Sequence, residues 1–410
     1  MADPERPAGR PPLRVLHVST RYPPGPGGVE RHVREVVRRQ RDGGLDARVV
    51  SSDLYTEIPL VRLENGPVRT WTDVEGVPVL RWPARVLPGE LHYPFLPGLY
   101  RRLRQEHPAL LHVHTYGTYQ GFSATALRRL NGVPWVLSAH FHPTWSIWGG
   151  ARRKALRRVY DRFLSGPVVR SASRGIVQTA EEERLLREVV EPSVLVRIPP
   201  GYTPLPPPSG EGEGFRARYG VPGPFLLFVG RLASNKGLAS LLGAFAELAP
   251  KRPELSLILV GEDGGEARGT LEEAARRGLG ERVRWVGFVA EDALLASAYA
   301  EAECLVLPSE YEAFGLVLVE ALAQGTPVVA SRVGGMREIV EPGRNGALVP
   351  PGDPRALAQA LEELLSDPAH AREMGRWGRE NTVPRYRWEN VVAALGRLYQ
   401  EVLAGQGPAP

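Results

Sequence analysis

Two glutamates with a spacing of eight positions stand out in the segment SEYEAFGLVLVEALAQGTPVVAS, residues 309–331. The second, Glu320, lies within an apolar run, where burying an unpaired charge would cost several kcal/mol, so we expect a buried carboxylate with a partner. A helix is expected from about Gly315 to Ala323, with Glu312 just before it. The partner of Glu320 could be an arginine of this Arg-rich chain or the hydroxyl groups of a ligand.

The start of this expected helix offers hydrogen-bond donors beside Glu312. The first backbone amides of a helix have no acceptor within it, so the amides of Phe314, Gly315 and Leu316 become free donors. Sugar hydroxyl groups both donate and accept hydrogen bonds, and a carboxylate next to free amides can satisfy both roles. The segment is therefore suited to binding a polyol.

A second segment, LLFVGRLASNKGLASLLGAF at 226–245, carries two cations between a buried strand and a helix. The strand ends at Gly230, Arg231 and Lys236 follow, and the helix begins near Gly237. In open parallel sheets ligands bind at the carboxyl ends of strands, and two cations beside a helix N-terminus suit a diphosphate. The alternative is a pair of solvated surface cations. The spacing is not that of a Walker A loop.

Histidines occur in two pairs with i,i+2 spacing, His112 with His114 and His140 with His142. Each pair lies on one face of an expected strand and could ligate a metal ion. No cysteine or carboxylate ligand lies near either pair, and the chain has no D-x-D motif. We therefore expect no metal ion, either at these pairs or on a bound diphosphate.

Short apolar runs recur along the chain with longer helical patterns between them, as in parallel sheets that helices cover on both faces. Strands are expected in the first half at 14–20, 47–52, 110–114, 134–140, 175–180 and 194–200, and in the second half at 225–230, 255–261, 282–288, 304–309 and 326–331. The pattern predicts an α/β protein with two doubly wound domains.

The domain boundary is expected in the Pro- and Gly-rich segment PPGYTPLPPPSGEGEG at 199–214, with the ligand cleft beside it. The predicted organisation is a disordered N-terminus at 1–12, a first domain at 13–203, a linker at 204–214, a second domain at 215–384 and a helix at 385–405. This last helix should cross back to the first domain, on an apolar stripe of Trp388, Val391, Val392, Leu395, Leu398 and Tyr399.

Composition excludes several classes of protein. With 410 residues, 43% hydrophobic and 24% charged, the chain is expected to be globular. No apolar run suggests a secretory signal or a membrane span. The single cysteine, Cys304, is expected to be a buried core thiol and points to a reducing cytoplasm. A net charge of +5 would fit nucleic acid, but the cations are scattered and no reading motif occurs, so we expect no nucleic-acid partner.

Several motifs together resemble the family 4 retaining glycosyltransferases of the GT-B fold, in which two Rossmann-like domains face a central cleft. They are VGRL…KG, VGEDGG, VGF, LPSEYEAFGLVLVEALAQGTPVVAS and GG…EIV, with PPGPGGVERHV, HVH and VLSAH in the first half. Glu312 and Glu320 match the family's E-x7-E motif. The resemblance implies metal-independent, cofactor-free transfer of a hexose from a UDP-, GDP- or ADP-linked sugar. Its acceptor is unidentified and could be a lipid or a cell-envelope glycan.

The resemblance also implies roles for individual residues. Catalysis would involve Arg231 and Lys236 on the diphosphate, Glu312 on the sugar, and His114. Glu320 would bind the nucleotide ribose. The expected donor-binding set is Gly27, Gly28, Gly230, Arg231, Lys236, Val286, Gly287, Phe288, Val289, Glu312, Ala313, Phe314, Gly315, Leu316 and Glu320; His140, Tyr116 and Trp145 would flank the acceptor. Many relatives have P-N-G where this chain has PPG, residues 199–201.

The segment TWSIWGGARRKALRRVYDRF at 144–163 has two readings. Basic residues beside Trp145 and Trp148 suit an anionic membrane surface, which would place the protein in the cytoplasm at the inner face of the membrane. The alternative is a solvated helix face beside a Trp-lined cleft. Rival functions for the whole chain are a nucleotide-sugar epimerase, a nucleic-acid-binding protein and a noncatalytic sugar-nucleotide sensor.

Overall fold

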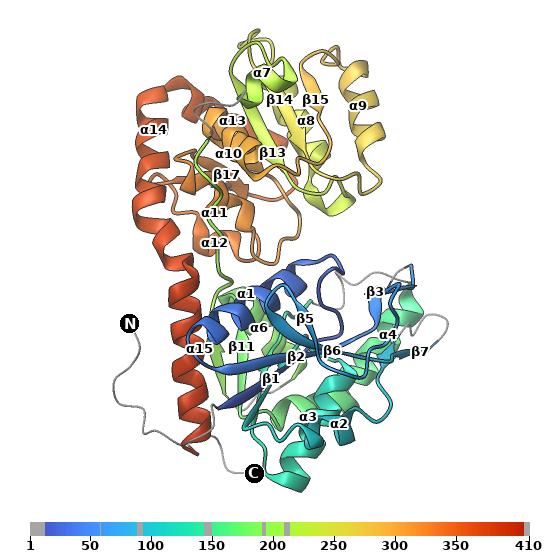
Figure 1. Cartoon of the computed structure of the whole chain (residues 1–410). Helices are drawn as coiled ribbons and strands as arrows, with labels where there is room; N and C mark the ends of the chain where they lie inside the picture. The colour runs from blue at the N-terminus through green and yellow to red at the C-terminus, as the bar shows by residue number, and fades with distance from the viewer. Residues whose placement is uncertain are drawn as a thin grey trace. The chain divides into compact units, whose positions relative to one another are not determined.

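The computed structural model describes residues 13–57, 59–87, 93–142, 150–190, 194–208 and 214–405. It divides into two compact units, Met1–Pro200 with Glu389–Pro410, and Gly201–Trp388 (Figure 1). The expected disordered N-terminus, residues 209–213 of the expected linker, and Trp145 and Trp148 lie outside the described residues.

The first unit is built on an eight-stranded sheet with the order β12-β11-β10-β9-β1-β2-β6-β5. The strands are β1 (Arg14–Val18), β2 (Asp46–Ser52), β5 (Thr72–Val74), β6 (Val77–Trp82), β9 (Leu110–His114), β10 (Trp135–Ser138), β11 (Arg174–Val177) and β12 (Leu195–Arg197). All neighbouring strands are parallel except β5 and β6. All six expected strands of this half form.

The region between residues 53 and 96 departs from the expectation of purely parallel sheets. It contains β5 and β6, which pair antiparallel at the sheet edge, and two small hairpins, β3 (Leu54–Thr56) with β4 (Val61–Arg62) and β7 (Arg85–Val86) with β8 (Pro94–Phe95). No strand was expected here, because these segments are short and only β6 has a substantial apolar pattern. Two antiparallel strands can be joined by a short turn, so no helical pattern separates them in the sequence.

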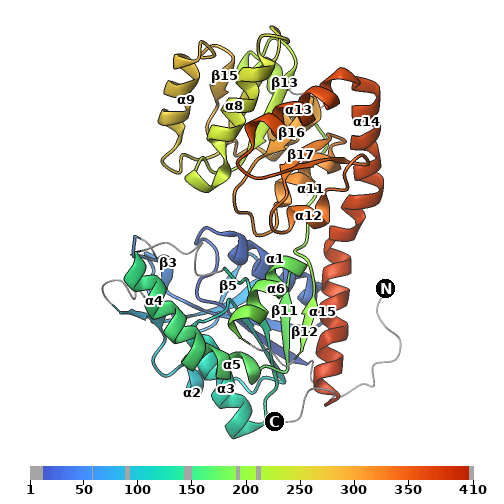
Figure 2. The same cartoon turned by 180° about the vertical axis from the view of Figure 1, so that it is seen from behind.

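Helices lie against both faces of each sheet, as Figures 1 and 2 show from opposite sides. In the first unit they are α1 (Gly28–Asp42), α2 (Leu99–Gln105), α3 (Tyr119–Asn131), α4 (Ala151–Tyr160), the π-helical turn η3 (Asp161–Ser165), α5 (Gly166–Arg170), α6 (Ala180–Val189) and α15 (Trp388–Leu403). In the described part of the chain, no helix combines the length and hydropathy needed to cross a bilayer.

The second unit has a six-stranded parallel sheet with the order β15-β14-β13-β16-β17-β18. The strands are β13 (Phe225–Val229), β14 (Ser256–Val260), β15 (Val283–Trp285), β16 (Cys304–Leu307), β17 (Val328–Ser331) and β18 (Gly346–Val349). The helices are α7 (Phe215–Tyr219), η4 (Ser234–Lys236), α8 (Leu238–Leu248), α9 (Ala267–Arg276), α10 (Asp292–Glu301), α11 (Leu316–Ala323), α12 (Met336–Ile339), α13 (Pro354–Ser366), α14 (Pro368–Trp377), η5 (Gly378–Thr382) and η6 (Val383–Tyr386). Of the six strands, only β18 was not expected.

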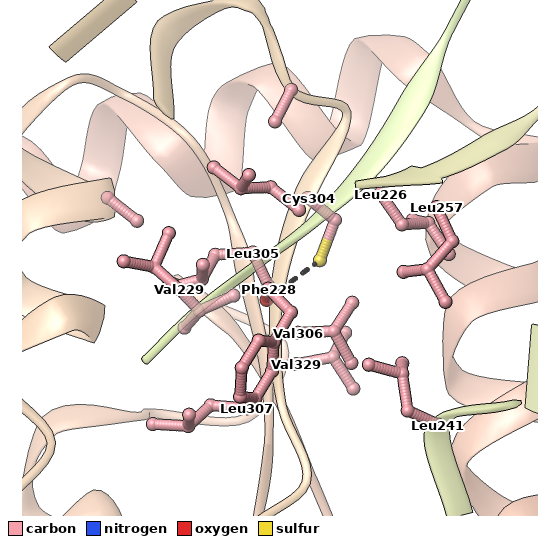
Figure 3. Packing of buried hydrophobic residues seen from close by; sticks show 14 of the residues in the cluster. Leu226, Phe228, Val229, Leu241, Leu257, Cys304, Leu305, Val306, Leu307 and Val329 are labelled. Carbon is pink, nitrogen blue, oxygen red and sulfur yellow. Dashed lines mark hydrogen bonds between the residues drawn. The ribbon is translucent and has the colours of Figure 1, made fainter. Parts of the chain in front are cut away.

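The core of the second unit forms where apolar side chains of β13, β14, β16 and β17 meet the surrounding helices (Figure 3). Cys304 lies among them with no exposed surface, which confirms that it is a core thiol. Burial raises the pKa of this thiol far above its ordinary value, so it stays protonated and unreactive. Continuous apolar strands are thus explained by burial on both faces.

The C-terminal helix α15 buries the expected apolar stripe, with Val392 only half-buried. Its first residue, Trp388, belongs to the second unit, and the residues from Glu389 belong to the first. The Trp388 ring lies against Gly201, where an added Cβ would be 2.2 Å from a ring carbon. The ring is held in place because its Nε1 donates to Thr203 Oγ1 at 2.9 Å. Gly201 therefore makes room for the tryptophan.

We expect Gly201→Ala to lower the free energy of unfolding by about 1–3 kcal/mol, because the new methyl overlaps a ring that cannot move freely. Gly396→Ala is the matched control. Gly396 lies inside α15, and no atom lies within 4 Å of the position that an added methyl group would take, so the same substitution should stabilise by about 0.5–1 kcal/mol. Urea unfolding of both variants measures the two values; equal effects would contradict this account.

Candidate active site

In the second unit, the expected cations and carboxylates meet where the order of strands reverses. Strands β13 and β16 are neighbours, but the chain continues from β13 to β14 on one side and from β16 to β17 on the other. The loops that leave the two carboxyl ends therefore diverge and leave room for a ligand. One loop carries Arg231 and Lys236, and the other carries Glu312.

Lys236 and Glu312 form an ion pair. The Lys236 Nζ lies 2.6 Å from Glu312 Oε2, and the two side chains are 19% and 18% exposed. The backbones of the loops are also bonded, since the amide of Glu310 donates to the carbonyl of Asn235 at 2.9 Å. The pair is therefore a fixed feature of the site and faces partly into solvent, where a charged ligand can reach it.

Glycines bring three strand ends close together beside this pair. The Gly261 amide donates to the Gly287 carbonyl at 2.8 Å. An added Cβ at Gly261, whose φ is +142°, would lie 2.0 Å from the carbonyl oxygen of Gly230. Arg231 follows Gly230 and is exposed. The ends of β13, β14 and β15 thus form one continuous edge next to the cation loop.

The expected base-contact segment, Val286–Val289, leaves the sheet earlier than its sequence suggests. Strand β15 ends at Trp285, so the segment is a loop and not the end of a strand as expected for 282–288. Val286 and Gly287 are half-buried, Val289 is buried, and Phe288 is 60% exposed. Gly287 has φ +80°, which turns the chain out of the sheet.

Helix α11 begins at Leu316, as the sequence predicts, with Gly315 as its N-cap at φ +92°. No side chain caps this end, so its first amides keep their capacity to bind an acceptor. Ala313 is exposed, and Phe314 is buried against Tyr386 at a ring-centroid distance of 5.4 Å. The N-terminus of α11 is therefore an open donor site next to Glu312.

The two glycines of the GG…EIV motif contact the backbone of the loop that carries Glu312. Gly334 has φ +48°, and an added Cβ there would lie 1.7 Å from the carbonyl oxygen of Glu312. The next residue, Gly335, donates its amide to the Ala313 carbonyl at 3.2 Å. Only glycine permits this approach, so the motif positions the backbone that carries Glu312.

Glu320 differs from its expected state. It is half-buried, not buried, and its Oε2 accepts a hydrogen bond from the Tyr299 hydroxyl at 2.6 Å. Burial raises the pKa of Tyr299 well above its ordinary value, and the charge of Glu320 adds to this. A tyrosine on α10 therefore supplies a structural partner that the sequence did not suggest.

The first unit has a similar reversal between β1 and β9, and here the polar side chains are histidines. His17 of β1 and His112 of β9 are register partners, and His114 follows two residues later on the same face. The opposite face of both strands carries Leu16, Val18, Leu111 and Val113, which join the apolar core with α2 and α3. All three histidines are fully buried.

These histidines are held by hydrogen bonds to neighbouring elements. His112 bonds to the hydroxyls of Tyr399 at 2.6 Å and Ser138 at 2.7 Å. His17 bonds to Gln40 Oε1 at 2.8 Å and to His114 Nε2 at 3.0 Å. Burial lowers the pKa of His17 to about 4 and lowers those of His112 and His114 well below the ordinary value, so all three are neutral at pH 7.

The three histidines form the group of residues, within the described part of the chain, that comes nearest to a metal site, with one nitrogen from each within 4.8 Å of the others. Five of their six ring nitrogens have hydrogen-bond partners, and His112 and His114 stack with their centroids 4.2 Å apart. Stacked rings do not direct their lone pairs to one point. The absence of a metal requirement stays a prediction.

The remaining expected residues occupy different surroundings. Gly27, with φ +149°, is the N-cap of α1, which no side chain caps, and Gly28 is its exposed first residue. His140 is half-buried, and its Nδ1 bonds to Gln178 Nε2 at 3.3 Å. Tyr116 is buried, and its hydroxyl donates to Asp161. Trp145 lies outside the described residues.

Sequence reasoning missed His17, Gln40, Tyr299 and Tyr399 as members of these networks. His17 carried a signal, since a histidine interrupts the apolar run at 14–18. The other three lie on helices whose patterns are typical of ordinary core and surface positions. Their role depends on which strand or helix lies opposite, and no local pattern contains that information.

We expect the free energy of unfolding to decrease as the pH falls from about 7 to about 4. Unfolded histidines, with a pKa of about 6.5, bind protons in this range, whereas His17, with a pKa of about 4, does not. Such a histidine costs on the order of 3 kcal/mol by pH 4. Three carboxyl groups act in the opposite direction, because burial raises the pKa of Glu182 to about 7 and also raises the pKa values of Glu30 and Asp161. They stand against five buried histidines whose pKa values are lowered, namely His17, His32, His112, His114 and His140.

Urea unfolding at stepped pH measures this dependence. His17→Gln should make it shallower, and His370→Gln, which makes the same substitution at an exposed position of the second unit, is the matched control. A free energy of unfolding that stays constant between pH 7 and 4 would contradict the neutral, buried state of these imidazoles.

Comparison with known proteins tests the resemblance. Residues 216–381 match the family model "Glycosyl transferases group 1", and residues 27–201 match "Glycosyl transferase 4-like domain". A D-inositol 3-phosphate glycosyltransferase from Thermobispora bispora is 31% identical over 417 residues, covering 95% of this chain and 94% of that protein. A glycogen synthase from Mycobacterium tuberculosis is 28% identical over 423 residues, covering 96% of each.

Solved structures of glycosyltransferases share the fold. Sucrose-phosphate synthase from Thermosynechococcus elongatus matches with a TM-score of 0.77 and 27% identity, over 96% of this chain and 100% of that one. Anabaena HepE, solved with UDP and glucose, matches with a TM-score of 0.72 and 20% identity, over 95% and 100%. The family and the GT-B fold expected from the motifs are confirmed. This chain belongs to the group 1 glycosyl transferases, as a family 4-type glycosyltransferase of the GT-B fold.

Proposed function

We propose that this chain is a retaining glycosyltransferase that transfers a hexose from a UDP-, GDP- or ADP-linked sugar without a metal ion or other cofactor. The observation that carries the proposal is the Lys236–Glu312 ion pair, next to the uncapped start of α11 at the reversal of the second sheet. A cation for the diphosphate and a carboxylate for sugar hydroxyls are held side by side there.

The chemistry follows from where negative charge develops. As the bond between the sugar and the diphosphate breaks, charge accumulates on the leaving phosphate oxygens. Arg231, Lys236 and the first amides of α11 stabilise that charge, which is the work a metal ion performs in other transferases. Glu312 holds the Lys236 ammonium in place before the donor arrives. Neither Glu312 nor Glu320 needs to act as a nucleophile.

The other donor contacts are those that the family resemblance implies for residues of each unit. Glu320, already bonded to Tyr299 through one oxygen, accepts a hydrogen bond from the ribose hydroxyls. The loop at 286–289 contacts the base, and Gly27 and Gly28 at the N-terminus of α1 complete the donor-binding set. His114 contacts the transferred sugar. The acceptor attacks from the face that the diphosphate leaves, while a phosphate oxygen takes its proton, so the anomeric configuration is retained.

We propose that the acceptor is a hydroxyl group of a lipid or of a cell-envelope glycan. The relatives' names cover inositol phosphate and glycogen as their own substrates or products. In this chain, His140, Tyr116 and Trp145 were expected beside the acceptor, and Trp145 lies outside the described residues. Because Tyr116 is buried with its hydroxyl bonded to Asp161, we assign a direct contact to His140 and not to Tyr116.

We expect Lys236→Ala to lower kcat/KM by about 100- to 1,000-fold, because the leaving diphosphate loses a preorganised cation. Lys251→Ala, which alters an exposed lysine of the same unit, is the matched control and should keep wild-type activity. Release of nucleoside diphosphate from a panel of UDP-, GDP- and ADP-sugars, in EDTA and with candidate acceptors, measures both. A folded Lys236→Ala variant with wild-type rates would refute the phosphate assignment.

The same assay tests the stereochemistry and the rival functions. Nuclear magnetic resonance of the product should show the anomeric configuration of the donor. An inverted product, or activity that EDTA abolishes, would overturn the corresponding part of the proposal. An epimerase would convert a sugar nucleotide without any acceptor, which the same spectra detect.

We also propose that helix α4 and the turn after it contact an anionic membrane from the cytoplasmic side. Four large apolar residues are exposed at helical spacing, namely Leu156, Val159, Phe163 and Leu164. Around them lie Arg152, Arg153, Lys154, Arg157, Arg158 and Arg162. Apolar side chains ringed by cations suit the boundary between acyl chains and anionic headgroups. Among these cations, Arg157 pairs with the buried Asp161 at 2.8 Å.

Vesicle flotation tests this surface. The protein should bind vesicles that contain phosphatidylglycerol, and binding should weaken at about 0.5 M salt, because the attraction is screened. Phe163→Ser should reduce the bound fraction roughly tenfold. Phe163 is 69% exposed, and Leu130→Ser, which alters a residue 71% exposed on α3, is the matched control. Equal effects of the two substitutions would contradict a membrane surface at α4.

A further inference from the structure

An unbroken chain of hydrogen bonds links six buried side chains of the first unit, from β10, β9, α15, α1 and β1. It runs from Ser138 Oγ to His112 Nε2 (2.7 Å), from His112 Nδ1 to the Tyr399 hydroxyl (2.6 Å), from there to Gln40 Nε2 (3.3 Å), from Gln40 Oε1 to His17 Nε2 (2.8 Å), and from His17 Nδ1 to His114 Nε2 (3.0 Å). It ends at His114, the last residue of β9.

The amide of Gln40 determines where the protons lie on the two histidines that follow it. The carbonyl oxygen Oε1 can only accept, so the Nε2 of His17 must carry the proton that it donates. His17 is neutral at pH 7, so its Nδ1 has no proton and must accept from His114 Nε2. His114 is neutral as well, which leaves its Nδ1 unprotonated. The chain therefore selects one of the two tautomers of His114.

That unprotonated nitrogen has no partner. The Nδ1 of His114 is buried and makes no hydrogen bond within the described part of the protein. An unsatisfied buried acceptor destabilises a folded protein, so this nitrogen calls for a partner such as a ligand hydroxyl or a water molecule. A sugar presents several hydroxyl groups that can donate to it. A lone pair fixed in direction is therefore ready for one hydroxyl proton.

We propose that Gln40 and His17 are positioning residues, which hold His114 in the tautomer whose Nδ1 accepts a hydrogen bond from one hydroxyl of the donor sugar. The inference deepens the proposed function and rests on it for the identity of the ligand. Neither Gln40 nor His17 touches the sugar; both act through His114. What they determine is the direction of the hydrogen bond, and so which sugars the site accepts.

Tyr399 of the C-terminal helix bonds to the other end of the Gln40 amide. Its oxygen accepts from Gln40 Nε2, so its hydroxyl proton is left for His112 Nδ1, and the Gln40 oxygen faces His17. If the amide turned over, every bond in the chain would reverse, and His114 would present a proton on Nδ1 instead of a lone pair. The two directions predict opposite tautomers of His114, which makes them distinguishable by experiment.

The first test is the tautomer of His114 in the free, full-length protein. Long-range proton–nitrogen correlation spectra of protein labelled with nitrogen-15 in histidine distinguish a protonated from an unprotonated ring nitrogen. The His114 signals are identified by their loss in His114→Gln. We expect a protonated Nε2 and an unprotonated Nδ1 at pH 7.5. A protonated Nδ1 overturns the proposal, whatever the enzyme's activity.

The second test removes the amide. Gln40→Met keeps the length of the side chain but can neither donate nor accept as Gln40 does, so both tautomers of His114 should appear in the spectrum. Tyr399→Phe should produce the same change to a smaller extent. The matched control is Tyr100→Phe on α2. It removes a hydroxyl that bonds to Asn131 at 3.0 Å and is not part of the hydrogen-bond chain. His114 should keep a single tautomer in that control.

The third test connects the tautomer to the sugar by calorimetry. The tightest-binding nucleotide sugar of the UDP, GDP and ADP panel is compared with analogues in which one hydroxyl is replaced by hydrogen. In the wild type, one analogue should bind about 10-fold more weakly, and in Gln40→Met the same replacement should cost less than about threefold. An equal penalty in both proteins overturns the proposal.

The outcomes separate this inference from the proposed function. If no nucleotide sugar binds the wild type, the proposed function fails and the sugar contact fails with it, while the spectra still decide whether Gln40 fixes the tautomer. If sugars bind and are transferred but His114 keeps one tautomer in Gln40→Met, the proposed function stands and the positioning role of Gln40 is refuted.

Discussion

Parallel pairing of two central strands is the constraint on which both halves of this protein depend. In each sheet, β1 with β9 or β13 with β16, two neighbouring strands send their next connections to opposite sides. Main-chain hydrogen bonds hold the pair together, and helices bury both of its faces. The loops at their carboxyl ends diverge, so polar residues there stay near solvent without leaving the core exposed.

The two reversals are used differently because the surroundings of their polar groups differ. In the second unit the ends are closed by glycines, and the functional groups are charged, with Lys236 and Glu312 neutralising each other at the surface. In the first unit the polar groups lie within the strands and are buried. A buried charge would be costly there, so the side chains are imidazoles held neutral by desolvation.

Burial of so many polar groups demands that almost every nitrogen and oxygen has a partner. Helices α1 and α15 meet that demand by placing Gln40 and Tyr399 against the histidines. The C-terminal helix is thus more than a cover for apolar surface, since it completes the hydrogen bonding of β1 and β9. In the second unit the GG motif also holds a functional segment in place, because Gly334 and Gly335 contact the backbone of Glu312 and Ala313.

Local patterns in the sequence predicted most of the strands and two of the helices that matter here. Runs of apolar residues predicted eleven strands, helical spacing predicted α11 and α15, and the lone cysteine was correctly placed in the core. Each of these depends on neighbours within a few positions, because strand and helix periodicity are local properties of the chain. The motif residues that the loops carry, Arg231, Lys236 and Glu312, could be named for the same reason.

Tertiary structure alone decided which of these groups meet. Lys236 and Glu312 are 76 positions apart, and Gln40 and Tyr399 are 359 apart. Glu320 was expected to be buried, but the turn of α11 that carries it leaves it half-exposed against Tyr299. The antiparallel strands β5 and β6 were not predicted either. Contacts of this kind depend on strand order and on helix rotation, which are set by packing of the whole unit and leave no periodic trace in the sequence.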